Sequence, residues 1–525
     1  MNLKRSYRIS IVLTFAVLYT CCTVNTTAQV GYSRMIDSIT NLVTLQSIAR
    51  LDREISGDTT VLIGSQTDTI LSRNYSSPYR TLAAQYILQK FQSFGLNARF
   101  MVYRSTGKDV IATKTGVKYP NQKYIISSHY DDMPPGPIAP GADDNGSGTC
   151  AVLEAARLLS TLTLDYTVEF VTFDEEELGL IGSHAYVDSA FARGDSIVGV
   201  FNMDMIAYDS NNDNVMEFRT DTNSYPLSIE AINIFDIYQH QYTPNLIFDP
   251  THNSDHASFW DHGYRAILCI ESLLDFNPYY HTINDNFSHV NVPFFLGISR
   301  AAIAWLLTAS LDYHMNFFHV PINTGYANIP SIATVIINSN KGIAHGSNAP
   351  RLYYKVDSSS YYYVNSFYND LDTFKFSIPG QQSGSTVYYY IAAQDSLGNF
   401  VGTLPLGGRG QNPPGTIAPL VQFQYAVVTS VISNSEPVKY SLGQNYPNPF
   451  NPDTRINFTL ERTTAVKLIV YDILGSKVSV LVNSRLNSGN YSVDFNGSEL
   501  PSGIYFYALY LNGNRFGTKK MVLLK

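Results

Sequence analysis

The sequence predicts an α/β domain followed by two all-β domains, and three observations support this order. From about residue 32 to residue 317, short apolar strand-like segments alternate with stretches of helical periodicity. This is the pattern of a mostly parallel or mixed sheet covered by helices. After about residue 319, short strands rich in Tyr and Val follow one another without helices, which is typical of an immunoglobulin-like β-sandwich. The stretch ISNSEPV at 432–438 reads as a linker, and a second all-β segment follows it.

These changes divide the 525 residues into a leader, 1–28, an α/β domain, 29–318, a first sandwich, 319–431, and a second sandwich, 439–525. The hydrophobic content of 45% is enough to build sizeable cores. A chain this rich in aromatic residues, with a net charge of only −8, is not expected to be disordered. The negative net charge also argues against a nucleic-acid-binding protein.

The individual elements follow from periodicity and from turn residues. In the α/β domain we expect helices at 79–94 and 147–159 and strands at 123–128, 167–173, 197–203 and 265–270. In the first sandwich we expect strands at 332–337, 351–356, 374–378 and 386–393, and in the second at 455–460 and 466–471.

The amino-terminal end predicts a signal peptide. Basic residues precede an apolar run at 9–19, and a polar stretch ending at Ala28 offers small residues for cleavage. The run is too short to span a bilayer comfortably. A lipoprotein site at Cys21 or Cys22 is the weaker alternative, because Tyr19 stands where a small residue is expected. No later segment reaches 18 consecutive apolar residues, so we expect no stable membrane span.

Two cysteines, Cys150 and Cys269, lie beyond the leader. In an exported protein they would either form a disulfide or remain as two buried thiols. The sequence leaves both alternatives open.

Residues of metal-binding type follow three predicted strands at the point where each strand ends. His129 and Asp131 come after the first, Glu176 and Glu177 after the second, and Asp204 after the third. The ligand crevice of an open α/β sheet lies outside the carboxyl ends of its strands. Unpaired carboxylates gathered there would repel one another. The pattern therefore predicts a metal site.

A glycine-rich segment, GADDNGSG at 141–148, predicts a flexible loop that leads into the helix at 147–159. Asp144 is expected near the amino terminus of that helix, where the helix dipole favours an anion. Such a loop could also bind phosphate, but its two carboxylates argue against an anionic ligand. A metal ion is the better counter-charge.

Six motifs carry a family resemblance. They are HYDD (129–132), PGADDNGSG (140–148), FDEEELGLIGS (173–183), NMDM (202–205), SDHASFW with the following GY (254–264) and NPYYHTIND (277–285). In order and spacing they resemble the secreted di-zinc aminopeptidases, the bacterial leucyl aminopeptidase type of metallopeptidase family 28. The resemblance covers about residues 30–317 and implies the phosphorylase/hydrolase-like zinc-peptidase fold.

The resemblance also implies a ligand set for two Zn²⁺ ions. His129 and Asp204 would both bind the first ion, and Glu177 and His281 would both bind the second. Asp144 would bridge the two ions. Imidazole and carboxylate are ligands that zinc prefers. A water held between the two ions would be the nucleophile.

Two further carboxylates receive catalytic roles from the same resemblance. Glu176 would be the general base, because the family pattern fits only if Glu176 and Glu177 form the pair, which leaves Glu175 as a spectator. Asp131 lies two residues from His129 and would accept the second imidazole N–H, which fixes the ring's tautomer. A solvated loop acid is the plainer interpretation of Asp131.

The resemblance places Asp255, His256 and Tyr264 in the substrate cleft. A separate metal site in the His-rich segment 251–262 is the alternative. The segment DSNNDN at 209–214 imitates the start of a calcium loop but lacks the later Gly and Glu. We interpret it as a hairpin turn, with accessory Ca²⁺ left open.

The carboxy-terminal segment carries a second resemblance. QNYPNPFNP (444–452), LPSGIY (500–505) and KKMVLLK (519–525) resemble the C-terminal sorting domain of the type IX secretion system. This implies the type IX machinery as a partner and a secreted or cell-surface location. A binding sandwich that stays attached is the alternative.

Together these features predict an exported zinc exopeptidase, an aminopeptidase that acts on peptides or proteins. A single-zinc glutaminyl cyclase is one alternative, and a catalytically inactive surface adhesin is another. The intact ligand set, His129 included, favours two metals and an active enzyme. The sequence does not separate aminopeptidase from carboxypeptidase activity.

Overall fold

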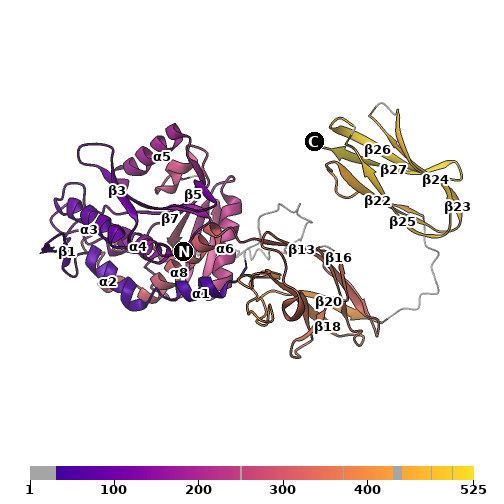
Figure 1. Ribbon diagram of the computed structural model, residues 1–525, viewed down its shortest axis with the longest axis horizontal. Coiled ribbons are helices and arrows are strands. Elements are labelled where there is room, and N and C mark those ends of the chain that lie inside the picture. The colour runs from indigo at the N-terminus through magenta and orange to yellow at the C-terminus, as the bar shows by residue number, and fades with distance from the viewer. Residues whose placement is uncertain are drawn as a thin grey trace, which may run out of the picture. The chain divides into compact units, whose positions relative to one another are not determined.

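The computed structural model describes residues 31–248, 251–370, 372–429, 440–473, 476–498 and 500–524. The chain divides into two compact units, Met1–Thr429 and Ser430–Lys525 (Figure 1). The predicted signal peptide, 1–28, and the predicted linker, 432–438, lie outside the described residues.

The first unit begins with an α/β domain built on an eight-stranded mixed sheet. The strand order is β3-β4-β6-β5-β7-β10-β8-β9. The pairs β5–β6, β5–β7, β7–β10 and β8–β9 are parallel, whereas β3–β4, β4–β6 and β8–β10 are antiparallel. The strands are β3 (Asn97–Val102), β4 (Lys108–Lys114), β5 (Tyr119–His129), β6 (Tyr166–Phe173), β7 (Ser196–Met203), β8 (Val215–Thr220), β9 (Thr243–Phe248) and β10 (Ala266–Glu271). A short hairpin, β1 (Val61–Ile63) with β2 (Gln66–Asp68), precedes them.

Helices cover both faces of this sheet (Figure 1). They are α1 (Arg34–Thr40), α2 (Leu45–Ile55), α3 (Tyr79–Ser93), α4 (Gly148–Leu159), α5 (Ile181–Arg193), α6 (Tyr225–Tyr238), α7 (His256–Trp260) and α8 (Val292–Ser310). Successive strand residues point to opposite faces. Val110 and Ile126 thus pack into the core with α3, α4, α6 and α8, while Ile111 and Ile125 pack into the smaller core with α5 and α7.

The predicted elements of this domain are confirmed to within a few residues. The helix expected at 79–94 is α3, and the strand expected at 167–173 is β6. Strands β3, β4, β8 and β9 were not predicted. The edge strands β3 and β9 are partly exposed and lack a continuous apolar run. Their neighbours β4 and β8 are mostly buried, but charged residues interrupt their apolar sequence.

Helix α8 is long and apolar enough to cross a bilayer by length and composition, but 78% of its apolar window is buried within the domain. It carries Ser299, Arg300 and Thr308, so no run of 18 apolar residues exists there. We interpret α8 as a core helix.

A β-sandwich completes the first unit. One sheet has the order β11-β13-β17-β16 and the other β12-β20-β18-β14-β15, with β19 paired to β18. The strands are β11 (Met315–His319), β12 (Thr324–Tyr326), β13 (Ser331–Ser339), β14 (Arg351–Val356), β15 (Tyr362–Asn365), β16 (Tyr368–Asp370), β17 (Thr373–Ile378), β18 (Thr386–Gln394), β19 (Val401–Leu404) and β20 (Phe423–Val428). Strand β11 crosses the domain boundary expected after residue 318. The immunoglobulin-like character stays a prediction.

The second unit is also a two-sheet β structure. Its sheets have the orders β21-β22-β25 and β24-β23-β26-β27 around one apolar core. The strands are β21 (Ser441–Leu442), β22 (Asp453–Leu460), β23 (Thr464–Tyr471), β24 (Lys477–Leu486), β25 (Gly489–Asn496), β26 (Gly503–Leu511) and β27 (Asn514–Leu523).

Candidate metal centre

Five side chains of metal-binding type meet at the carboxyl ends of the parallel strands. His129 is the last residue of β5, Glu177 follows β6, and Asp204 follows β7. Asp144 comes from the loop before α4, and His281 from the loop after β10. The strand ends therefore bring together residues that lie up to about 150 positions apart, as expected for an open α/β sheet.

The five side chains form two groups that share one residue. His129, Asp144 and Asp204 form the first group, and Asp144, Glu177 and His281 form the second. Within each group one donor atom from every residue lies within 4.8 Å of the others. These are the only such groups among the described residues. The arrangement brings together every residue for which we expect a metal-binding role.

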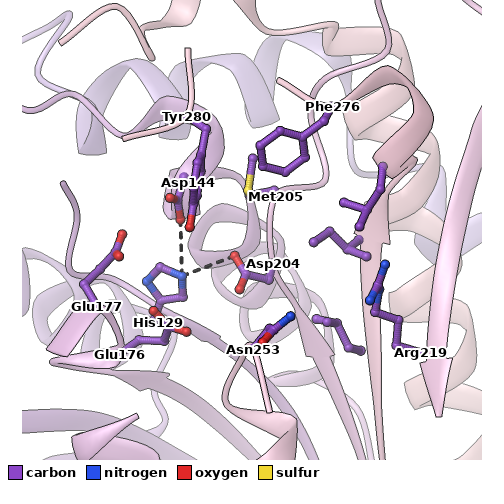
Figure 2. A pocket seen from close by; sticks show the side chains of 13 residues that line it. His129, Asp144, Glu176, Glu177, Asp204, Met205, Arg219, Asn253, Phe276 and Tyr280 are labelled. Carbon is purple, nitrogen blue, oxygen red and sulfur yellow. Dashed lines mark hydrogen bonds and ion pairs between the residues drawn. The ribbon is translucent and has the colours of Figure 1, made fainter. Parts of the chain in front are cut away.

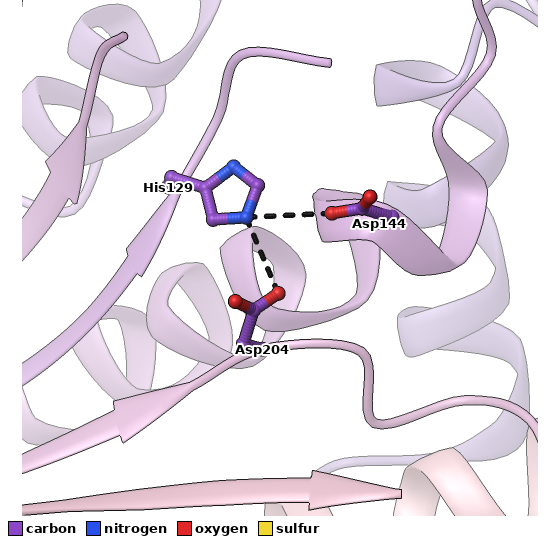
Figure 3. Close-up of side chains that lie close together, drawn as sticks. All are labelled: His129, Asp144 and Asp204. Carbon is purple, nitrogen blue, oxygen red and sulfur yellow. Dashed lines mark hydrogen bonds and ion pairs between the residues drawn. The ribbon is translucent and has the colours of Figure 1, made fainter. Parts of the chain in front are cut away.

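Asp144 turns one oxygen toward each group. Its Oδ1 lies 3.4 Å from His129 Nε2, which is also 3.2 Å from Asp204 Oδ1 (Figure 3). Its Oδ2 lies 3.2 Å from His281 Nε2, which is 2.8 Å from Glu177 Oε2. A carboxylate with one oxygen in each group can bridge two cations.

A pocket of about 380 Å³ opens over the two groups (Figure 2). Glu176 lines it together with His129, Asp144, Glu177 and Asp204. Most of the remaining lining is apolar and consists of Met205, Leu268, Ile270, Leu273, Phe276 and Tyr280. Arg219 and Asn253 are polar and complete the lining. A cluster of ionisable groups thus borders a space that suits an apolar side chain.

Residues 109–306 match the family described as Peptidase family M28. The first domain belongs to this family. Residues 444–524 match the family described as the secretion system C-terminal sorting domain.

Three named proteins are similar to part of this chain. Aminopeptidase YwaD from Bacillus subtilis is 31% identical over 201 residues, which is 35% of this chain and 41% of that protein. Leucine aminopeptidase 1 from Sclerotinia sclerotiorum is 28% identical over 278 residues, 47% of this chain and 68% of that protein. A solved structure of the LapA aminopeptidase of Legionella pneumophila aligns with a TM-score of 0.49 at 21% identity, covering 56% of this chain and 78% of that one.

The ionisation of the cluster fits a cation site. Burial opposes charge on Glu177 and, with Asp144 nearby, raises the pKa of its carboxyl to about 8. Burial lowers the pKa of His281, but the carboxylates of Asp144 and Glu177 beside its Nε2 outweigh it and raise the value to about 10. Glu177 Oε1 is buried without a hydrogen-bond partner among the described residues. The M28 domain has more buried acid here than its own cations neutralise, and the imidazole and carboxylate donors suit zinc.

Asp131 connects the first group to the glutamate turn. Its carboxylate accepts the backbone N–H groups of Glu176 at 3.1 Å and Glu177 at 3.2 Å. His129 Nδ1 lies 3.2 Å from the backbone carbonyl of Asp131 and 3.5 Å from its Oδ1. The backbone oxygen is thus the nearer acceptor for the ring N–H that we expected the carboxylate to hold. Asp131 is 1% exposed, unlike a solvated loop acid.

The three glutamates after β6 point to different surroundings. Glu175 Oε1 pairs with Arg80 at 2.9 Å and with Arg104 at 2.6 Å. Glu176 and Glu177 line the pocket. Burial raises the pKa of Glu176 well above its usual range. The geometry therefore favours Glu176 and Glu177 as the pair that faces the site, with Glu175 outside it.

The residues predicted to contact substrate do not line the pocket. Asp255 is fully buried. His256 is 1% exposed, and its ring packs edge-on against that of Trp260 with 4.4 Å between the ring centroids. The Tyr264 hydroxyl donates to the carbonyl of Asp195 at 3.2 Å. Their substrate-binding role stays a prediction, and Asn253 is the residue of this segment that the pocket lining includes.

The alternative metal sites find no support among the described residues. His252 lies 3.1 Å from Asp261, and His262 lies 3.0 Å from Asp188, so each imidazole pairs with a separate acid. In the segment that imitates a calcium loop, Asp209 accepts the backbone N–H groups of Asp213 and Asn214. The hairpin turn predicted there is wrong, because the flanking strands β7 and β8 each pair with β10 and not with each other. The two cysteines are buried and free.

Sequence reasoning missed the residues that hold the Asp144 loop. The segment 141–148 was expected to be flexible, but all eight residues are buried. Asp285 and Arg73 bind its backbone. Asp285 lies in the NPYYHTIND motif, four residues after His281, and this position could have suggested a role. Nothing near Arg73 in the sequence points to the site.

Proposed function

We propose that this chain is an exported zinc-dependent aminopeptidase that removes residues from the amino terminus of peptides. The observation that carries the proposal is the pair of donor groups sharing Asp144, with Glu176 beside them in the pocket wall. Membership of family M28 and the aminopeptidases among its relatives support the reaction class.

The donor set suits two zinc ions, with His129 and Asp204 on one, Glu177 and His281 on the other, and Asp144 on both. Zinc bound there would supply Lewis-acid chemistry, polarising the scissile carbonyl and lowering the pKa of water. Proton transfer and substrate binding are left to the side chains of the pocket.

Glu176 is the proposed general base. Its carboxylate takes a proton from the attacking water and delivers that proton to the leaving amine, so the same group serves as base and then as acid. Asp131 holds the backbone of Glu176 and so fixes the position from which its carboxylate reaches the pocket.

The pocket wall supplies the binding energy for the first residue of the substrate. Leu268, Ile270 and Phe276 offer apolar surface to its side chain. Burying apolar surface contributes about 25 cal/mol per Å². The pocket therefore favours a large apolar first residue.

Export is the second part of the proposal. The sorting-domain family match at 444–524 supports passage to the cell surface or beyond by the type IX machinery. The leader expected at 1–28 would provide the first step across the inner membrane.

A substrate screen with and without a zinc chelator tests the activity. Peptides blocked at the carboxyl terminus should lose their first residue, peptides blocked at the amino terminus should survive, and chelation should stop the reaction. Chelator-insensitive hydrolysis, or none of either kind, would overturn the proposal. Cyclisation of an amino-terminal glutamine without hydrolysis, together with one tightly bound zinc, would support the glutaminyl cyclase instead.

A further inference from the structure

Two buried side chains of opposite charge hold the loop that carries Asp144. Arg73 binds the chain at Pro140 and Gly141, and Asp285 binds it two to three residues later. Neither side chain belongs to the two donor groups. Arg73 is 0% exposed and Asp285 is 1% exposed. A buried charge of this kind is costly unless it is paired and hydrogen-bonded, so the bonds that each side chain makes indicate what it does.

Arg73 binds backbone carbonyls. Its Nη1 donates to the carbonyl of Pro140 at 2.6 Å and its Nη2 to that of Gly141 at 2.7 Å. Its Nε donates to the carbonyl of Tyr130 at 2.6 Å, one residue after His129 ends strand β5. Asp132 balances the charge, with Oδ2 3.4 Å from Nη1. The planar fork of the guanidinium thus joins the end of β5 to the start of the Asp144 loop, which a point-like ammonium cannot do.

Asp285 binds backbone N–H groups of the same loop. Its Oδ1 accepts from Asp143 at 3.2 Å and its Oδ2 from Asp144 at 3.0 Å. Asn277 donates to Asp143 Oδ2 at 2.9 Å and to Asp285 Oδ1 at 3.4 Å. The backbone N–H of Ala142 donates to the Asp285 carbonyl at 2.9 Å. The segment that carries His281 is therefore fastened to the segment that carries Asp144.

Gly141 shows how closely the loop fits against the cation. Its φ of +48° lies in the left-handed region. A Cβ added there would stand 2.6 Å from Arg73 Nη2 and 2.4 Å from the Asp144 carbonyl oxygen. The glycine permits the approach of Arg73 rather than making the loop flexible.

We propose that Arg73 and Asp285 are positioning residues for the shared ligand Asp144. The cation binds carbonyls at the start of the loop and the anion binds N–H groups two and three residues later, so together they fix the loop's path. Because Asp144 belongs to both donor groups, loosening the loop weakens both zinc positions at once. The proposal rests on the proposed zinc site, but not on peptide hydrolysis.

The variants are Asp285→Asn and Arg73→Lys. In Asp285→Asn, one carboxylate oxygen becomes an NH₂ group that faces a backbone N–H, and the loop loses one of its two bonds there. In Arg73→Lys, the charge remains but the fork is lost. Asp395→Asn is the control for replacing a buried carboxylate away from the site. Asp395, in the first sandwich, is 1% exposed, and its Oδ1 alone accepts the N–H groups of Asn399 and Phe400 at 2.7 and 3.0 Å, bonds that the asparagine oxygen can keep.

The measurement is zinc affinity of the full chain, by titration against a competing chelator, with circular dichroism as the check on folding. We expect both variants to bind both zinc ions about 10–100-fold more weakly, the usual effect of losing a group that orients ligands. Saturating zinc should restore most of kcat. The control should bind zinc as the unaltered chain does.

Three results separate the possibilities. Wild-type zinc affinity in folded Asp285→Asn would overturn the positioning role, even if Arg73→Lys failed to fold. A loss confined to one zinc position would overturn it as well, because Asp144 is shared. An unaltered chain that binds zinc tightly but cleaves no peptide, with both variants weakened, would refute the proposed function and leave the positioning role supported.

Discussion

The run of three glutamates after β6 allows the proposed general base to be tested against its own neighbours. Replacing Glu176 by Gln keeps the side chain's shape and leaves both donor groups intact, because Glu176 belongs to neither. Only the ability to carry a proton is lost. General-base catalysis contributes about 10²–10⁴ in rate, which corresponds to about 3–5 kcal/mol of activation free energy. We expect kcat to fall by that factor with zinc content unchanged.

The flanking residues provide the controls. In Glu177→Gln, the contact at 2.8 Å to His281 loses its charge, and zinc content should fall together with activity. In Glu175→Gln, the ion pairs with Arg80 and Arg104 are weakened, which costs about 2 kcal/mol of stability for charged hydrogen bonds. That variant should melt a few degrees lower and keep its kcat.

The assay combines steady-state hydrolysis of a leucyl peptide with metal analysis of each purified variant. Glu176→Gln with more than a tenth of wild-type kcat would refute the general-base role. A Glu175→Gln variant that lost as much kcat as Glu176→Gln, while folded and zinc-loaded, would show that the register of the pair is wrong.

Three further outcomes follow from the structure. Gly141→Ala should cost at least about 1–2 kcal/mol, because alanine disfavours the left-handed region, and it should weaken zinc binding; a melting temperature and zinc affinity equal to wild type would contradict this. Phe276→Ala should lower kcat/KM for leucyl substrates about tenfold, or about 1.4 kcal/mol, and leave alanyl substrates nearly unchanged; equal losses for both would argue against the apolar pocket. Burial lowers the pKa of His319, whose Nε2 lies 2.9 Å from the Tyr389 hydroxyl. As the pH falls below about 6.5, His319 takes up a proton in the unfolded chain at a higher pH than it does in the folded chain. Stability should fall as pH drops through that range, and less steeply in His319→Gln when thermal unfolding at pH 5 and pH 8 is compared.

The sequence was most informative where burial and chemistry coincide. Central strands such as β6 and β7 are buried on both faces, so they appear as continuous apolar runs. Each ends at an acidic residue, which marks the carboxyl edge of the sheet. These two signals pointed to the acidic residues that follow β6 and β7, and the family resemblance then implied Glu177 and Asp204 as ligands.

The substrate side of the pocket was less predictable. Leu268, Ile270 and Phe276 are ordinary apolar residues of a strand and the loop after it, and nothing in their spacing separates a pocket wall from a core. The SDHASFW motif drew attention to Asp255 and His256, which the fold buries instead. A motif marks a segment, whereas the pleat of the sheet and the path of a loop decide which of its side chains reach the cleft.

Arg73 shows the limit of sequence reasoning most clearly. It lies outside residues 109–306, which match family M28, and its partners Tyr130 and Gly141 follow it by 57 and 68 positions. Apart from the ion pair with Asp132, the groups that its side chain binds are backbone carbonyls. Every residue possesses a carbonyl, so no pattern of residue types predicts the contact. The glycine that permits it was itself read as a sign of flexibility. A segment rich in glycine can be among the most constrained in a protein when buried side chains satisfy its peptide groups, and here that constraint falls on the one carboxylate that both donor groups share.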